Sequence, residues 1–191
     1  MATIAVVYHS GYGHTARQAE AVMKGAASVP GMEAALYPVS EMGEKEWQEL
    51  SAADAIIFGA PTYMGSVSAP FKEFMDQSSK VWFSQGWKDK ISAGFTNSAS
   101  QSGDKLNSLI QLMIFAMQHS MIWVGTGLLP GNNHSQGSVN DLNRLGSSSG
   151  AMAQSNADQG AEAMLESDLD TASRLGMRVA EKTLQFISGR N

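Results

Sequence analysis

The sequence predicts an α/β fold in which a five-stranded parallel sheet carries helices on both faces. Short apolar runs alternate with segments that have helical periodicity, and the strongest run, residues 55–59, is apolar throughout. A strand buried on both faces of a sheet requires such a continuous run. Right-handed crossovers between parallel strands then place helices on both faces, so we expect a doubly wound, three-layer sandwich.

The first half of the chain contains three predicted strands and two predicted helices. Residues 4–8 form an apolar run, and residues 15–27 carry apolar side chains at helical spacing. A Pro-Gly pair at positions 30 and 31 ends that unit, and a weaker, peripheral strand follows at 33–37. A short polar helix at 44–50 then leads to the apolar strand described above.

The second half supplies two more strands and three helices, predicted at 69–77, 91–96, 106–118, 121–124 and 169–187. Pro70 suits the first turn of its helix, where the missing N–H costs little. Between residues 125 and 161 the periodic pattern gives way to Gly, Ser, Asn and Gln. A loop of that length inside a compact domain is usually functional or poorly ordered, and of these we expect a functional loop before the last helix.

Composition limits the chemistry available to the chain. Its 191 residues are most simply one domain, covering 1–191. There is no cysteine and no metal-binding spacing of histidines, so we expect no metal site, and any redox chemistry must use a bound cofactor. The net charge of −5, without a dense Lys/Arg run, argues against nucleic acid as a partner.

The N-terminus leads directly into a predicted strand, without the features of a secretory signal, so we expect a cytoplasmic protein. The most apolar window, residues 109–124, is interrupted by polar side chains and is short for a membrane-spanning helix. We interpret this window as a buried helix followed by a strand and expect no membrane partner.

The segment Ser10-Gly11-Tyr12-Gly13-His14-Thr15 lies between the first strand and the first helix. Backbone N–H groups of such a turn, together with the positive end of the helix, can surround an anion. The anion could belong to a flavin, a dinucleotide or a free phosphate. The spacing also satisfies G-x-G-x-x-A, but no acidic residue is well placed at the end of the second strand to hold a ribose.

Two further loops follow predicted strands, at residues 59–65 and 96–103. The second of them is rich in small polar residues. Ligands of open α/β sheets bind beyond the carboxyl ends of the strands, where the strand order reverses. We therefore expect the anion-binding turn and these two loops to converge on one rim of the sheet.

With these loops together, the chain resembles the flavodoxin-like FMN proteins, most closely the WrbA-type NAD(P)H:quinone oxidoreductases and their FMN reductase relatives. The resemblance covers nearly the whole chain. It rests on residues 10–15, 61–65 and 74–77, on Trp82 and on the long insertion before the last helix. It implies a single flavodoxin-like FMN-binding domain with sheet order 2-1-3-4-5.

The resemblance also implies where FMN is held. Its phosphate would be bound by Ser10, Gly11, Tyr12, Gly13, His14 and Thr15. Its ring would be flanked by Pro61, Thr62, Tyr63, Met64 and Gly65. The other polar edge of the ring would be covered by Asn97, Ser98, Ala99, Ser100, Gln101 and Ser102. Small residues let backbone N–H groups approach the ring, so no side chain is expected to act as a catalytic acid or base.

Four positions are expected to bind substrate. Trp82 matches an aromatic surface near the substrate or nicotinamide site of the family. Gln118-His119 stands where the family has a histidine pair that faces the flavin from a neighbouring subunit. Ser149 occupies a region of the insertion where the family often has an aromatic residue, so substrate preference is expected to differ.

The expected function is an FMN-dependent oxidoreductase that passes a hydride from NADH or NADPH to a quinone-like acceptor by a ping-pong scheme, as a homotetramer. An FMN reductase that releases reduced flavin is the nearest alternative. A flavodoxin-type electron carrier and a phosphate-binding regulatory module are the others. No arginine cluster selects NADPH over NADH.

Overall fold

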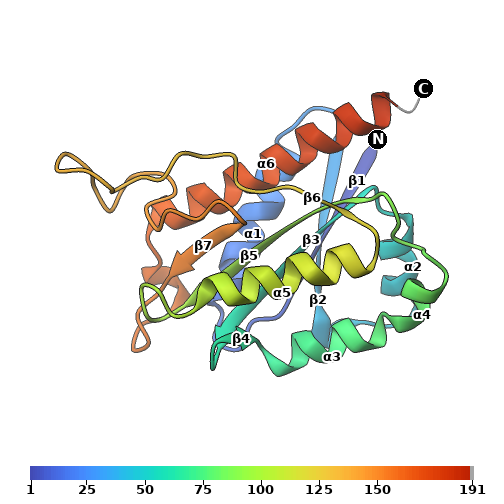
Figure 1. Ribbon diagram of the computed structural model, residues 1–191, viewed down its shortest axis with the longest axis horizontal. Coiled ribbons are helices and arrows are strands. Elements are labelled where there is room, and N and C mark those ends of the chain that lie inside the picture. The colour runs from blue at the N-terminus through green and yellow to red at the C-terminus, as the bar shows by residue number, and fades with distance from the viewer. Residues whose placement is uncertain (190–191) are drawn as a thin grey trace.

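The computed structural model describes residues 1–189 and contains one sheet with helices on both faces (Figure 1). Its parallel path runs β2-β1-β3-β5-β6. These strands are β1 (Ala2–Tyr8), β2 (Met32–Pro38), β3 (Ala55–Tyr63), β5 (Ile91–Ser98) and β6 (Ile122–Trp123). The predicted order 2-1-3-4-5 is confirmed, with β5 and β6 as its fourth and fifth strands.

Helices α1 (His14–Ala27) and α6 (Glu166–Ser188) cover one face of the sheet. The other face is covered by α2 (Glu44–Ala52), α3 (Ala69–Gln77), α4 (Ser79–Phe83) and α5 (Lys105–Gln118). Continuous apolar strands such as β3 are buried against both layers, as the sequence predicts. Short 3₁₀ turns at Val39–Glu41 and Ala161–Ala163 complete the described elements.

The predicted fifth strand, 121–124, is shorter than expected and is completed by a distant segment. Strand β6 pairs only with Ile91–Ser92, and β7 (Ala151–Gln154) continues beside β5 at Phe95–Ser98. Between the parts of β5 that pair with β6 and with β7, the Trp123 indole lies over Gly94. A Cβ added at Gly94 would lie 2.6 Å from that ring. The prediction of a continuous loop from 125 to 161 is therefore wrong at 151–154, because the insertion interrupts the fifth strand.

Part of this insertion projects from the body of the molecule (Figure 1).

Strands β3 and β5 both extend past the predicted ends at residues 59 and 96. Pro61, Thr62 and Asn97 consequently lie in strands, where the sequence analysis expected loops. The signal of β3 ended early at Gly59-Ala60-Pro61, which is typical of a turn, and that of β5 ended where the polar Asn97 and Ser98 follow.

Two further elements have no counterpart in the sequence analysis. Strand β4 (Ser66–Val67) forms an antiparallel hairpin with the end of β3, and α4 follows α3 directly.

Among residues 1–189, no helix is both long and apolar enough to cross a membrane.

Candidate functional site

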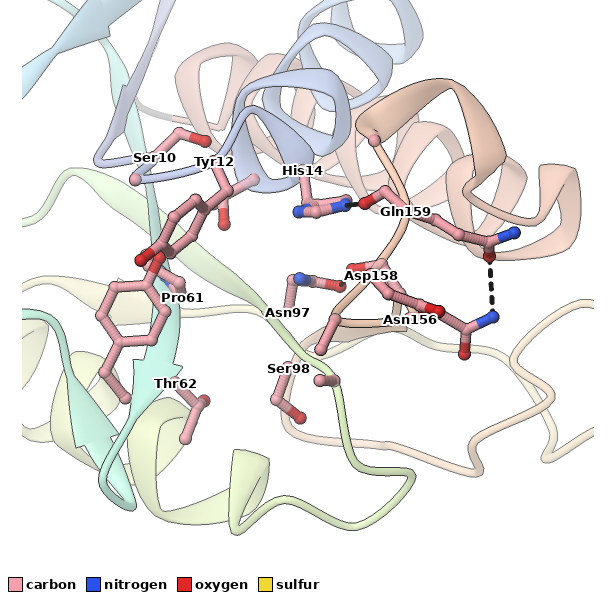
Figure 2. Close-up of a pocket in the computed structure, with 17 residues that line it drawn as sticks. Ser10, Tyr12, His14, Pro61, Thr62, Asn97, Ser98, Asn156, Asp158 and Gln159 are labelled. Carbon is pink, nitrogen blue, oxygen red and sulfur yellow. Dashed lines mark hydrogen bonds between the residues drawn. The ribbon is translucent and has the colours of Figure 1, made fainter.

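A cavity of about 660 Å³ lies at the carboxyl ends of β1, β3 and β5 (Figure 2). Its volume falls within the range of small-molecule binding sites. Residues from all three predicted segments line it: Ser10, Gly11, Tyr12, His14, Thr15, Pro61, Thr62, Tyr63, Asn97, Ser98 and Ala99. The expected convergence of three segments on one rim is thus present.

The turn before α1 is preformed for an anion. Gly13 has φ +88°, a left-handed conformation that glycine adopts without strain, and its N–H donates to Ser10 Oγ at 3.1 Å. Helix α1 begins at the next residue and has no acidic side chain in its first turn. The partial positive charge of the helix N-terminus therefore acts on the cavity without competition from a nearby carboxylate of that turn.

Tyr63 closes one side of this turn. Its hydroxyl lies against Gly11, where a Cβ would come within 2.6 Å of the phenol oxygen, and it accepts a hydrogen bond from the Gly11 N–H. Burial raises the pKa of Tyr63, so the phenol stays protonated at neutral pH. The Tyr12 ring meets it edge to face, with centroids 6.3 Å apart. Together the two tyrosines form an aromatic wall beside the turn.

Hydroxyl groups fix the ends of β3 and β5 relative to each other. Thr62 Oγ1 lies 2.8 Å from the hydroxyl oxygens of both Thr96 and Ser108. Thr96 also contacts the Ala60 carbonyl oxygen at 2.7 Å. The hydroxyls of Thr62, Thr96 and Ser108 are buried polar groups. Their hydrogen bonds to one another and to the Ala60 carbonyl therefore hold the cavity floor in one geometry.

The far wall of the cavity is a segment that the sequence analysis did not assign to the site, residues 155–160. It directly follows β7, and the pairing of β7 with β5 places it beside the cavity. Gln159 accepts a hydrogen bond from His14 Nε2 through its carbonyl oxygen at 2.9 Å, which requires a proton on Nε2 (Figure 2). Ser155 donates to Asn97 Oδ1 at 2.9 Å. The signal that could have found this wall is the short apolar run at residues 151–153, which interrupts the polar insertion.

The described cavity lining contains no Lys or Arg, and Asp158, which is exposed, is its only carboxylate. Arg17 lies nearby but donates to the Ala161 carbonyl oxygen at 3.0 Å. An anion in this cavity would therefore be held by backbone N–H groups, hydroxyls and the helix dipole.

Several predicted cofactor residues lie on the converging segments but do not line the cavity: Gly13, Met64, Gly65, Ser100, Gln101 and Ser102. Met64 is fully exposed at the tip of the β3–β4 hairpin. Its φ of +49° and that of +77° at Gly65 form the turn of that hairpin. The carbonyl groups of Ser100 and Gln101 instead turn inward to a buried lysine.

The structure brings Trp82, Gln118 and His119 together, away from the residues that line this cavity. Two clefts of about 400 and 600 Å³ both contact these three residues. Ser149 lies apart from them, and its carbonyl oxygen accepts a hydrogen bond from Trp123. The substrate residues expected from the resemblance therefore form a separate cluster within one chain, with Ser149 outside it.

His119 belongs to the core in this structure. It is 3% exposed, contacts Ser78 Oγ through Nε2 at 2.9 Å and packs against Trp87 and Phe115. Burial lowers its pKa to about 4, so the imidazole is neutral at physiological pH. Its Nδ1 has no hydrogen-bond partner among the described residues.

Comparison with protein families gives a match to the family described as NADPH-dependent FMN reductase over residues 32–136, more than half of the chain. The chain belongs to this family. Flavodoxin FldP of Pseudomonas aeruginosa (strain UCBPP-PA14) is 47% identical, over 94% of this chain and 96% of that protein. A NAD(P)H dehydrogenase (quinone) of Aromatoleum aromaticum (strain DSM 19018 / LMG 30748 / EbN1) is 30% identical, over 98% of each chain.

Among solved structures, the flavodoxin, WrbA-like protein from Agrobacterium tumefaciens is similar with a TM-score of 0.77 and 44% identity. The match covers 97% of this chain and 99% of that one. The family resemblance inferred from residues 10–15 and 61–65 is confirmed. In this family member, the cavity at the strand ends is the candidate cofactor site.

Proposed function

We propose that this protein is an FMN-dependent oxidoreductase that takes electrons from NAD(P)H and passes them to a quinone-like acceptor. The observation that carries the proposal is the cavity formed where the anion-binding turn meets the ends of β3 and β5. Membership of the FMN reductase family supports FMN as the cofactor and a nicotinamide nucleotide as the donor.

The residues present fit FMN. The turn at Ser10–Thr15 offers N–H groups and the positive end of a helix to a phosphate, with no carboxylate in its first turn. The opposite end of the cavity, between Thr62 and Ser98, has polar backbone and small side chains beside the tyrosine wall (Figure 2). An elongated ligand with an anionic end and a planar polar end matches this arrangement.

When bound, FMN would supply the hydride-transfer chemistry between NAD(P)H and the acceptor, in what we propose is a ping-pong scheme. The chain holds the phosphate end at the turn and orients the ring end between β3 and β5. The hydroxyls of Thr62 and Thr96 keep that end rigid. No side chain is assigned as a general acid or base.

The acceptor is proposed to bind near Trp82, which is 49% exposed and contributes an aromatic surface to both clefts beside Gln118. Because these clefts are separate from the cavity, we propose that one copy presents this surface to the cavity of another. The family resemblance leads us to propose a homotetramer as the assembly. We also propose that the protein is a single domain, that it acts in the cytoplasm and that the 125–161 region is a functional loop.

A second candidate is a flavodoxin-type electron carrier with no substrate of its own. It is favoured by the 47% identity to Flavodoxin FldP over nearly the whole chain. An FMN reductase that releases reduced flavin is a third, and the family name supports it.

The deciding experiment is a titration of the apoprotein with FMN, followed by steady-state assays of NADH and NADPH against benzoquinone and against free FMN. Rapid oxidation of a nicotinamide with benzoquinone, while FMN stays bound on dilution, supports the quinone oxidoreductase. Turnover only with free FMN supports the reductase. Bound FMN without nicotinamide oxidation supports the carrier, and no FMN binding rejects all three.

A further inference from the structure

Lys105, the first residue of α5, is only 1% exposed. Lysine is almost never fully buried unless its charge is compensated, because the ammonium loses its hydration. Burial of this side chain therefore needs a physical reason in the surrounding structure.

The ammonium of Lys105 organises the loop that precedes it. Nζ donates to Ser98 Oγ at 2.8 Å, to the Ser100 carbonyl oxygen at 2.8 Å and to the Gln101 carbonyl oxygen at 2.7 Å. An ammonium has three N–H donors, so all of them are used. Gly103 lets the loop close, because a Cβ there would come within 2.2 Å of Ser98 Oγ.

All three acceptors are neutral. Within residues 1–189, Lys105 takes part in none of the ion pairs found. The charged groups that shift the pKa of Lys105 are Asp168 on α6 and Arg144 of the insertion, which pair with each other at 2.6 Å. Asp168 raises the pKa of Lys105 and Arg144 lowers it, but burial is the largest cause and brings the pKa to about 8. The positive charge thus lacks a direct counter-charge.

The charge is also close to the candidate cofactor. Ser98 lines the cavity, and its hydroxyl is the atom that Lys105 contacts, so one side chain separates the ammonium from the cavity. Figure 2 shows Ser98 at the end of the cavity away from Ser10 and His14, where the ring of FMN would lie. No Lys or Arg lines the described wall itself.

Resting on the proposed function, we propose that Lys105 is a positioning residue that sets the electron affinity of bound FMN. Its ammonium fixes the 98–101 loop, of which Ser98 lines the cavity, and favours the reduced cofactor electrostatically. Transfer of a hydride adds two electrons and one proton to the ring, hence one negative charge. A nearby buried cation stabilises that added charge more than it would stabilise the oxidised ring.

The test compares Lys105→Met, which keeps the length but removes the charge, with the unaltered protein and with Lys45→Met. Lys45 is a matched control because its side chain is 78% exposed on α2. Binding of oxidised and reduced FMN is measured by anaerobic titration, and the midpoint potential by dye equilibration. In Lys105→Met, we expect reduced FMN to bind about tenfold more weakly relative to oxidised FMN. The potential then falls by about 30 mV for the two-electron couple.

Lys105→Arg separates the charge from the shape of the side chain. It retains a permanent cation and is expected to keep the potential of the unaltered protein. Because reduction should raise the pKa of Lys105 above its value of about 8, an extra proton is taken up on reduction at higher pH. In the unaltered protein, the single proton taken up with two electrons makes the potential fall by about 30 mV per pH unit, and above about pH 8 the extra proton should steepen this fall to about 60 mV per pH unit. Lys105→Arg should lack this break.

The outcomes separate this proposal from the proposed function. If the unaltered protein binds no FMN, both are rejected. If FMN binds but Lys105→Met weakens both redox forms equally or matches Lys45→Met, only the role of Lys105 is rejected. Should Lys105→Met fail to fold, the pH series decides: a break present in the unaltered protein and absent in Lys105→Arg supports the role, and no break overturns it.

Discussion

At the residue scale, the candidate site depends on two glycines that lack a side chain. Gly11 leaves room for the Tyr63 hydroxyl, and Gly13 supplies a left-handed turn. Both glycines were identifiable from the motif in the sequence. The contact between Gly11 and Tyr63 was not, because Gly11 lies in the turn before α1 and Tyr63 lies at the end of β3, far away in the sequence.

Gly11→Ala should displace the Tyr63 ring, because the new Cβ would lie 2.6 Å from the phenol oxygen. We expect FMN to bind about tenfold more weakly, the effect of losing about one hydrogen bond. Adding Tyr63→Phe should restore most of the affinity by removing the clashing oxygen. Quenching of FMN fluorescence measures both variants. If the double variant binds no better than Gly11→Ala, the clash is not the cause.

His119 should make stability depend on pH. The pKa of the folded imidazole is about 4, below its ordinary value of 6.5, so the unfolded chain binds more protons between these values. Stability is therefore full above about pH 6.5 and falls by about 3 kcal/mol as the pH drops toward 4. Urea unfolding across this range measures it, and His119→Gln should flatten the dependence.

At the element scale, α1 and α6 pack with their backbones in contact. Gly25 faces the Ser173 backbone and Gly176 faces the Val22 backbone, and a Cβ at either would overlap main-chain atoms. This contact fixes the direction of α1, whose N-terminus carries the anion-binding turn. The helices themselves were predicted from periodicity, but their close approach was not.

Gly176→Ala should destabilise the protein by about 2 kcal/mol, because overpacking against fixed backbone costs roughly 1–3 kcal/mol. Helix propensity alone predicts the opposite sign, a gain of up to about 1 kcal/mol for Gly to Ala. Urea unfolding decides between them. An unchanged or higher unfolding free energy would show that the helices can separate without cost.

At the scale of the whole molecule, the cavity and the Trp82 clefts are distinct within one chain. The proposed reaction needs both surfaces, which is the reason for proposing an assembly of copies. Cofactor binding needs only the cavity. Enzyme activity should therefore depend on protein concentration, and FMN binding should not.

Specific activity with NADH and benzoquinone should fall on dilution as assembled copies separate, while bound FMN remains quenched. Light scattering at the same concentrations reports the mass of the assembly. Trp82→Ala should raise the KM for the quinone and leave the affinity for FMN unchanged. Constant specific activity down to the mass of a monomer would contradict the proposed assembly.

Local periodicity in the sequence predicts a parallel sheet with helices on both faces, and glycine chemistry predicts the turn at Ser10–Thr15, because neighbouring residues encode both features. The strand order was predicted from the family resemblance and not from periodicity. Three features could be learned only from tertiary contacts: β7 completes the fifth strand, residues 155–160 wall the cavity, and Lys105 is buried behind Ser98. These depend on contacts between residues far apart in the chain or on the folding of a loop around a charge, and local pattern carries no information about such partners.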